Sequence, residues 1–73
     1  MRRNLRAERA RKGLSIEQTA RELGVHPNTV AAWERGDAEP LGINLIALAK
    51  FFDCSPDYLL DVSNDAHRGL VTS

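Results

Sequence analysis

One set of side chains is spaced like a stripe along one face of a helix: Asn28, Ala31, Ala32 and Arg35. Residues at positions i, i+3, i+4 and i+7 of a helix lie on the same face. The stripe holds no nucleophile, and its polar members offer hydrogen bonds through an amide and a guanidinium group. With Pro27 at its tip, a helix of this kind fits the major groove of DNA, which is about 12 Å wide. The stripe therefore favours recognition over catalysis.

The rest of the chain lacks the arrangements that enzymes and metal sites use. No Ser, His and Asp are arranged as a catalytic triad, and no glycine-rich loop could cradle a phosphate. His67 has no partner at metal-ligand spacing, so we expect neither a metal nor a cofactor. Cys54 is the only cysteine, which excludes an internal disulfide and favours a buried structural thiol in a reducing cytoplasm.

The charged residues are distributed unevenly along a chain whose formal net charge is zero. Residues 1–12 carry six basic residues and one acidic residue, a net charge of +5. Residues 37–73 carry two basic residues and six acidic residues, a net charge of −4. Such asymmetry is typical of chains that contact nucleic acids. A helix with a solvated basic face would give the same pattern, so charge alone leaves both interpretations open.

Glycine and proline divide the sequence into five helical segments. Gly13, Gly24 and Gly36 each end a segment of helical pattern, and Pro40 interrupts the chain before the fourth segment. The expected helices span residues 3–12, 16–23, 27–35, 42–52 and 56–61. No run of alternating β-branched residues predicts a strand, so the fold class is all-α.

Capping signals mark the helix starts. Ser15 and Gln18 have the spacing of a capping box, and Pro27 suits the first position of the next helix. His26, just before that proline, is interpreted as a solvent-facing cap, with a phosphate contact or pH sensitivity as alternatives. The three residues 24–26 between two short helices predict a helix-turn-helix over residues 16–35.

The apolar residues at helical spacing predict one core. They are Leu5, Leu14, Ala20, Leu23, Val25, Val30, Trp33, Leu41, Leu45, Leu48, Ala49, Phe52 and Leu59. Residues 1–61 are expected to form a single domain, and residues 62–73, which have no periodicity, a flexible tail. The longest apolar run, residues 45–49, is far shorter than the ~20 residues of a membrane helix, so we expect no membrane partner.

Several short motifs, in order, resemble the lambda-repressor-like family of Cro/Xre type over about residues 3–61. They are Gly13-Leu14-Ser15, Ala20, Leu23-Gly24-Val25, Trp33-Glu34-Arg35-Gly36, Pro40, Leu45 to Ala49, and Ser55-Pro56-Asp57-Tyr58-Leu59-Leu60. The resemblance implies a five-helix bundle that binds operator DNA, usually as a dimer, and regulates transcription. It implies no enzymatic activity.

The resemblance also implies roles for individual residues. The residues expected to contact DNA bases are Pro27, Asn28, Ala31 and Ala32. Those expected to contact phosphates are Ser15, Ile16, Gln18, Thr29 and Arg35, with the amides at Ser15 and Ile16 aided by the helix dipole. Arg9 would pair with Glu34 in a partly buried structural salt bridge.

The chain departs from the family pattern at its expected DNA surface. Ile16 stands where many relatives have a phosphate-binding Gln, and the acidic Asp37 and Glu39 stand where relatives often have Lys or Arg. Each lost phosphate contact flattens the salt dependence of binding by about 0.9 log units per log unit of salt. We therefore expect weaker, less salt-sensitive binding than in a basic relative. The alternative is a protein-interaction module of the same fold, with an antitoxin-like or adaptor role.

A homodimer, at least on DNA, is expected from the family and from the small surface that one short helix presents. Its two recognition helices would lie about 34 Å apart, one turn of DNA, on a palindromic operator. The segment around residues 58–60 and the tail are the candidate dimer interface.

Overall fold

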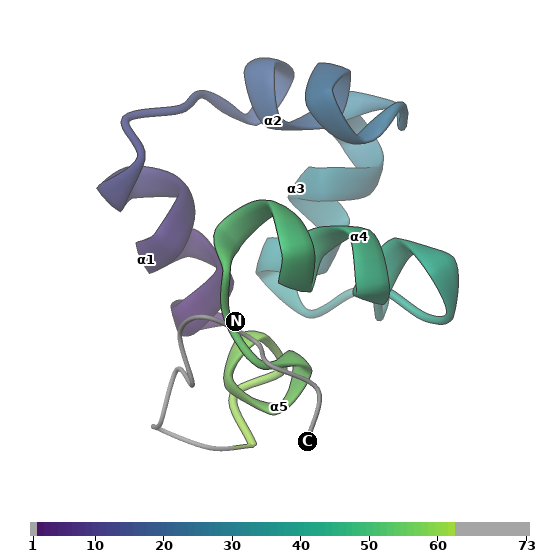
Figure 1. The fold of residues 1–73 in the computed structure, drawn as a ribbon. Helices are drawn as coiled ribbons and strands as arrows, with labels where there is room; N and C mark the ends of the chain where they lie inside the picture. Colours follow the sequence, from purple (N-terminus) through teal and green to yellow (C-terminus); the bar gives the residue numbers. More distant parts are fainter. Residues whose placement is uncertain (1, 63–73) are drawn as a thin grey trace.

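Five α-helices form the part of the chain that the computed structural model describes, residues 2–62 (Figure 1). They are α1 (Arg3–Arg11), α2 (Ile16–Leu23), α3 (Pro27–Arg35), α4 (Ile43–Phe52) and α5 (Pro56–Leu59). No residue between 2 and 62 lies in a strand. The predicted all-α class and the number and order of the helices are confirmed. The tail expected from residue 62 onward lies outside the described residues, apart from Val62.

The helices start where the sequence offers a cap. The Ser15 side chain accepts a hydrogen bond from the Gln18 amide at 3.0 Å, and the Gln18 side chain accepts one from the Ser15 amide at 2.8 Å. This reciprocal pair is the predicted capping box. Nδ1 of the exposed His26 accepts from the Asn28 amide at 3.0 Å, which confirms the solvent-facing cap.

Three helix ends differ from the prediction: α1 ends at Arg11 instead of residue 12, α4 begins at Ile43 instead of residue 42, and the end of the fifth helix differs most. The fifth helix stops at Leu59 instead of residue 61. Asp61 has a φ of 63°, in the left-handed region that a right-handed helix cannot contain. This conformation turns the Asp61 carboxylate onto the first amides of α1, so the end of the domain meets its beginning.

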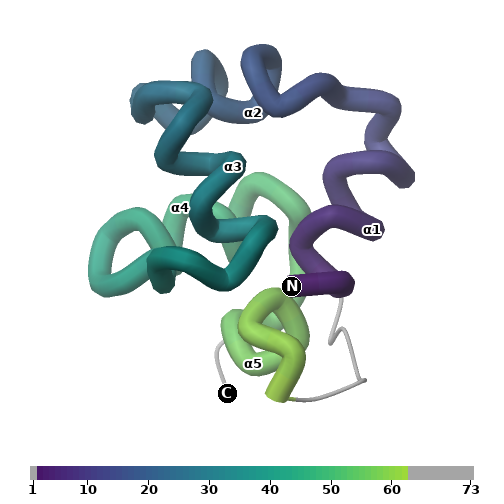
Figure 2. Tube along the Cα trace, turned by 180° about the vertical axis from the view of Figure 1, so that it is seen from behind, coloured from purple at the N-terminus to yellow at the C-terminus, as the bar shows by residue number. Residues whose placement is uncertain are grey.

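α2 and the turn into α3 lie at one end of the molecule, α3 runs from there toward the middle, and α5 lies at the other end (Figures 1 and 2). Gly24, with a φ of 72°, ends α2 in a left-handed conformation and lets the chain turn sharply into α3. α4 crosses behind α3 in the view of Figure 2, and α5 packs under the start of α1. This arrangement leaves one side of α3 covered by the core and the other side open.

Nine buried residues form the core: Leu5, Ala20, Val30, Trp33, Leu48, Ala49, Phe52, Cys54 and Leu59. Eight of them were expected there, and Cys54 confirms the interpretation of a buried thiol. Leu23 and Val25 are half-buried and pack against this core, and Leu14 and Leu45 are half-buried. No helix within residues 2–62 is long and apolar enough to cross a membrane.

The prediction of Leu41 as a core residue is wrong, since it is 67% exposed. The preceding Pro40 is fully buried and takes the place under the loop between α3 and α4. Leu41 then points outward together with Ile43 and Ile46, which are 79% and 54% exposed at the start of α4. A loop has no helical period, so the sequence pattern could not show which of the two adjacent apolar residues, Pro40 or Leu41, would be buried.

Candidate nucleic-acid interface

The core holds α3 by one face. Val30 and Trp33 are 0% and 3% exposed and pack among the other buried residues. On the opposite face, Asn28 and Arg35 are exposed. Ala31 and Ala32 are half-buried between them, as are Pro27 and Thr29 in the first turn. The structure thus brings the sequence-predicted stripe together on one accessible side of a single helix.

The start of α2 offers donors beside this stripe. The capping box uses side-chain oxygens of Ser15 and Gln18 as acceptors, and both residues are exposed. The same two side chains can also donate hydrogen bonds, Ser15 through its hydroxyl hydrogen and Gln18 through its amide hydrogens. The first amides of α2, at Ile16 and Glu17, have no partner one turn earlier in the helix. This turn therefore combines several donors with the positive end of the helix dipole.

A hollow of about 210 Å³ lies between α1, the start of α2 and α3. Its lining consists of Arg6, Arg9, Ile16, Ala31, Glu34 and Arg35. Ile16 and Ala31 provide an apolar part, and the arginines provide positive charge around it. Arg6 is a member of this site that sequence reasoning missed. Its place three residues before Arg9, on the same face of α1, was the available signal.

Arg9 and Glu34 form a two-bond ion pair that joins α1 to α3. Arg9 Nε lies 2.5 Å from Glu34 Oε2, and Arg9 Nη2 donates to Glu34 Oε1 at 3.1 Å. Arg9 also donates to the Leu14 carbonyl at 2.8 Å. The side chains are only 17% and 8% exposed. The bond to Glu34 raises the pKa of Arg9, against the lowering effect of burial. The pair implied by the family resemblance is therefore present in the structure.

Several basic residues of the N-terminal segment are engaged in ion pairs inside the molecule. Besides Arg9, Arg11 pairs with Glu8 at 2.8 Å, and Arg2 pairs with Glu39 at 3.3 Å. Glu8 is itself buried and accepts a hydrogen bond from the Tyr58 hydroxyl at 3.2 Å. The positive charge that the sequence concentrates in residues 1–12 thus serves partly to hold α1 against the other helices.

The acidic loop after α3 affects the stripe directly. Arg35 Nε donates to Asp37 Oδ2 at 2.8 Å, and the two side chains are 58% and 65% exposed. An exposed pair of this kind is worth at most about 1 kcal/mol. Because the negative charge of Asp37 lies beside Arg35, we expect Arg35 to bind a phosphate more weakly than an unpaired arginine would.

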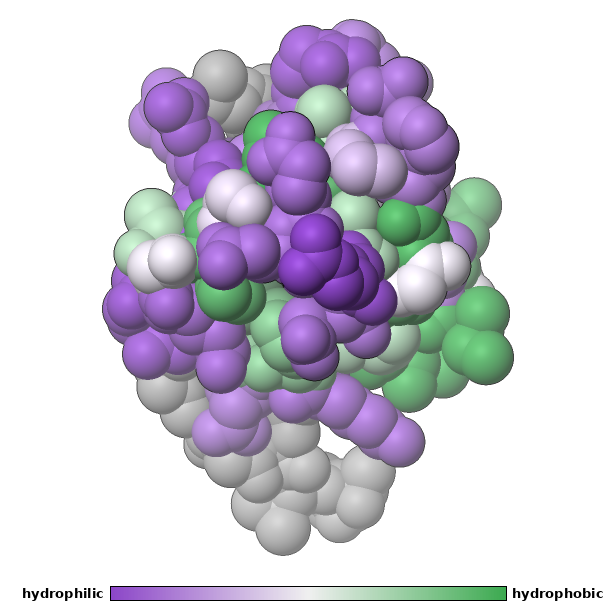
Figure 3. Space-filling view, turned by 90° about the horizontal axis from the view of Figure 1, so that it is seen from above, coloured by the Kyte–Doolittle hydropathy of each residue, from purple (hydrophilic) through white to green (hydrophobic). Residues whose placement is uncertain are grey.

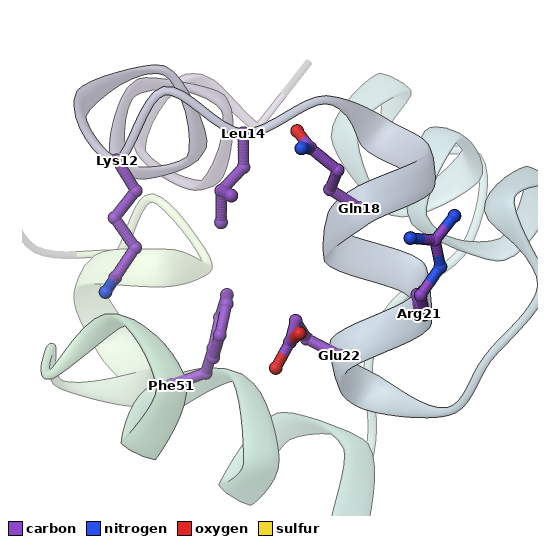
Figure 4. A pocket seen from close by; sticks show the side chains of 6 residues that line it. All are labelled: Lys12, Leu14, Gln18, Arg21, Glu22 and Phe51. Atoms are coloured by element: carbon purple, nitrogen blue, oxygen red, sulfur yellow. The ribbon is translucent and has the colours of Figure 1, made fainter.

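A second hollow, of about 370 Å³, lies away from α3 (Figure 4). Gln18 and Glu22 point toward it from α2, while Lys12, Leu14 and Phe51 line the other side. Arg21 of α2 also belongs to the lining, but its side chain points away from the hollow in this view. The Lys12 ammonium lies 5.2 Å from the centre of the Phe51 ring, within cation–π range. The lining of this second hollow carries both positive and negative side chains, which favour no single class of ligand.

The surface at the α2 end of the molecule is mainly hydrophilic, with an apolar group at one edge (Figure 3). Together, the two short helices joined by a sharp turn, the open stripe on the second helix and the donors at the start of the first define a helix-turn-helix domain.

Comparison with known proteins identifies the family. The sequence profile of the Helix-turn-helix family matches residues 5–59, and the chain belongs to this family. The resemblance to lambda-repressor-like proteins is thereby confirmed.

Two curated relatives are regulators by name. Repressor protein C2 of Salmonella phage P22 is 50% identical over 52 residues, which cover 68% of this chain and 24% of the repressor. The HTH-type transcriptional regulator DicA of Escherichia coli K12 is 46% identical over 52 residues, which cover 68% of this chain and 38% of DicA. The chain therefore spans less than two fifths of the length of either relative.

A solved structure shows the same fold. The crystal structure of the P22 c2 repressor protein in complex with a synthetic operator superimposes with a TM-score of 0.74 at 39% identity. The match covers 81% of this chain and 89% of the P22 chain. The predicted five-helix, lambda-repressor-like fold is confirmed.

Proposed function

We propose that this chain binds double-stranded DNA sequence-specifically and acts in the cytoplasm as a transcriptional regulator, most simply a repressor. The observation that carries the proposal is the open stripe on α3 beside the donor-rich start of α2. The same fold, at 39% identity, occurs in a P22 repressor solved with its operator. The relatives in the family are regulators, not enzymes, and the proposal involves no cofactor or metal.

In this proposal α3 is the recognition helix and enters the major groove. Asn28 bonds an adenine edge, and Pro27, Ala31 and Ala32 give apolar contacts to bases such as the thymine methyl group. Phosphates are bound by the helix amide at Ile16 and by the other polar groups at the rim of the site: Ser15, Gln18, Thr29 and Arg35. The Arg9–Glu34 pair supports this surface from behind and does not itself read the sequence.

Substitution of Asn28 by alanine tests the base-reading role. Selection of bound sequences from a random duplex pool first defines the preferred operator. We expect Asn28→Ala to weaken binding to that operator by about 1–3 kcal/mol, because one bidentate contact to a base is lost. Binding to an unrelated duplex should hardly change, since it depends on phosphates. Fluorescence anisotropy measures both, and an unchanged preference among sequences would refute the role of Asn28.

Binding at low salt separates this function from its rival. The electrostatic contribution to DNA binding is greatest there. If the wild-type chain binds no duplex even under these conditions, the fold serves a protein partner instead, as an antitoxin-like or adaptor module does.

We further propose that two copies bind a palindromic operator. Leu59 of α5 is only 1% exposed, and its packing in the core removes it from any interface around residues 58–60. The exposed apolar residues at the start of α4, Leu41, Ile43 and Ile46, are better suited to meet a second copy. Sedimentation with the operator should give two chains per duplex; one chain per duplex, with only monomer in its absence, would contradict the dimer.

A further inference from the structure

Arg2 is buried although it belongs to the basic N-terminal segment. The residue is 8% exposed, and its side chain lies against the end of α3 instead of facing solvent. Guanidinium groups are seldom buried unless their donors are paired. The partners of Arg2 therefore indicate why it lies there.

These partners all belong to the end of the recognition helix and the loop that follows it. Arg2 Nη1 donates to the Trp33 carbonyl and to the Ala38 carbonyl, both at 2.8 Å. Arg2 Nη2 pairs with Glu39 at 3.3 Å, and the Arg2 amide donates to the Glu34 carbonyl at 2.7 Å. The Trp33 carbonyl also accepts a hydrogen bond from the Gly36 amide at 3.2 Å. Carbonyls at the end of a helix carry partial negative charge, so a cation is favoured there.

The segment that carries Arg2 is itself held in place. Asp61 accepts hydrogen bonds from the amides of Arg3 and Asn4, at 2.8 and 2.9 Å. The Asn4 side chain donates to the Tyr58 carbonyl at 2.7 Å. The start of α1 is thus fixed to the end of α5, and Arg2 projects from this fixed point to the end of α3.

We propose that Arg2 is a positioning residue for DNA recognition, which fixes the last turn of α3 and residues 36–39 relative to α1. It makes no phosphate contact of its own. The inference rests on the proposed function, because it concerns the helix that would enter the groove. It also assigns opposite roles to neighbours in sequence, since the Arg3 side chain is exposed and Arg2 is not.

The matched variants Arg2→Ala and Arg3→Ala test the proposal, since each removes one positive charge from adjacent positions. We expect Arg2→Ala to weaken operator binding about tenfold, the value of one hydrogen bond to a charged group. Its binding to an unrelated duplex should fall less, and the slope of log affinity against log salt should stay the same. Arg3→Ala should change operator binding by less than about threefold, the effect of an exposed charge.

Two outcomes would overturn the positioning role. A salt slope reduced by about 0.9 in Arg2→Ala would identify Arg2 as a phosphate contact. Equal losses in Arg2→Ala and Arg3→Ala would show that only charge matters. Arg2→Lys is the third variant: its single ammonium cannot reproduce the planar fork, so partial recovery is expected, and full recovery would also contradict the proposal.

Amide hydrogen exchange on free protein separates this inference from the proposed function. The Asp37 and Ala38 amides donate to the Ala32 carbonyl, at 3.0 and 3.3 Å, and report on the loop that Arg2 holds. We expect them to exchange faster in Arg2→Ala and unchanged in Arg3→Ala, at a temperature where far-UV circular dichroism shows both variants folded. If the wild-type protein preferred no DNA sequence, the proposed function would be refuted, but the exchange rates would still test whether Arg2 holds the loop. Unchanged exchange at both amides would refute its hold on the loop.

Discussion

Arg9→Met should lower the free energy of unfolding by about 3 kcal/mol, the lower end of the range for breaking one side of a buried ion pair. Glu34 is 8% exposed, and its carboxylate would lose both of the hydrogen bonds that Arg9 now donates to it. The Leu14 carbonyl would also lose the donor that now lies 2.8 Å away. Methionine preserves most of the apolar stem of arginine, so the loss reports on the guanidinium and not on packing.

A double-mutant cycle isolates the contribution of the pair. Glu34→Gln alone removes the charge of the acceptor, and Arg9→Met with Glu34→Gln removes both charges. Urea denaturation followed by circular dichroism gives the four unfolding free energies. We expect the double variant to be more stable than the sum of the two single losses implies, because no buried charge remains unpaired. Additive losses would show that the two side chains do not interact energetically.

Trp33→Ala should lower the free energy of unfolding by about 3–5 kcal/mol, because it removes a large buried side chain and leaves a cavity. Trp33 is 3% exposed and belongs to the face of α3 that packs on the core. A single core of this size seldom supplies more than about 3–5 kcal/mol of net stability. Most of the variant should therefore be unfolded at room temperature, and DNA binding should fall in proportion to the folded fraction.

Trp33→Phe is the control, since it keeps an aromatic ring at the same site and should lose much less stability. Circular dichroism in the presence and absence of urea measures the folded fraction of both variants. A folded Trp33→Ala with wild-type stability would mean that α3 does not depend on this side chain for its place on the core.

Local signals were sufficient to predict the helices and most of the core. The capping box at Ser15 and the glycine at residue 24 each act within one turn of chain, so sequence spacing alone specifies them. The apolar residues at helical spacing converge on one core for the same reason. The stripe on α3 follows from the helix and from the position of Val30 and Trp33 on its opposite face.

The features that the sequence did not predict depend on residues far apart in the chain. Arg2 bonds carbonyls 31 and 36 residues away, and Asp61 bonds an amide 58 residues away. Both look like ordinary surface charges until the fold brings their partners beside them. The same holds for the buried Glu8, whose hydrogen bond to Tyr58 spans 50 residues. Spacing rules describe only contacts within an element, and these contacts join different elements.

Because Cys54 is buried, its thiol can report on transient opening of the core. Its thiol is fully shielded and donates to the Phe52 carbonyl at 3.2 Å, and the chain has no other cysteine. A thiol-specific reagent can reach this sulfur only when the surrounding helices separate for a moment. The labelling rate, compared with that of an unfolded peptide, therefore gives the free energy of that opening. Because Cys54 is the only cysteine, no substitution is needed to measure this opening.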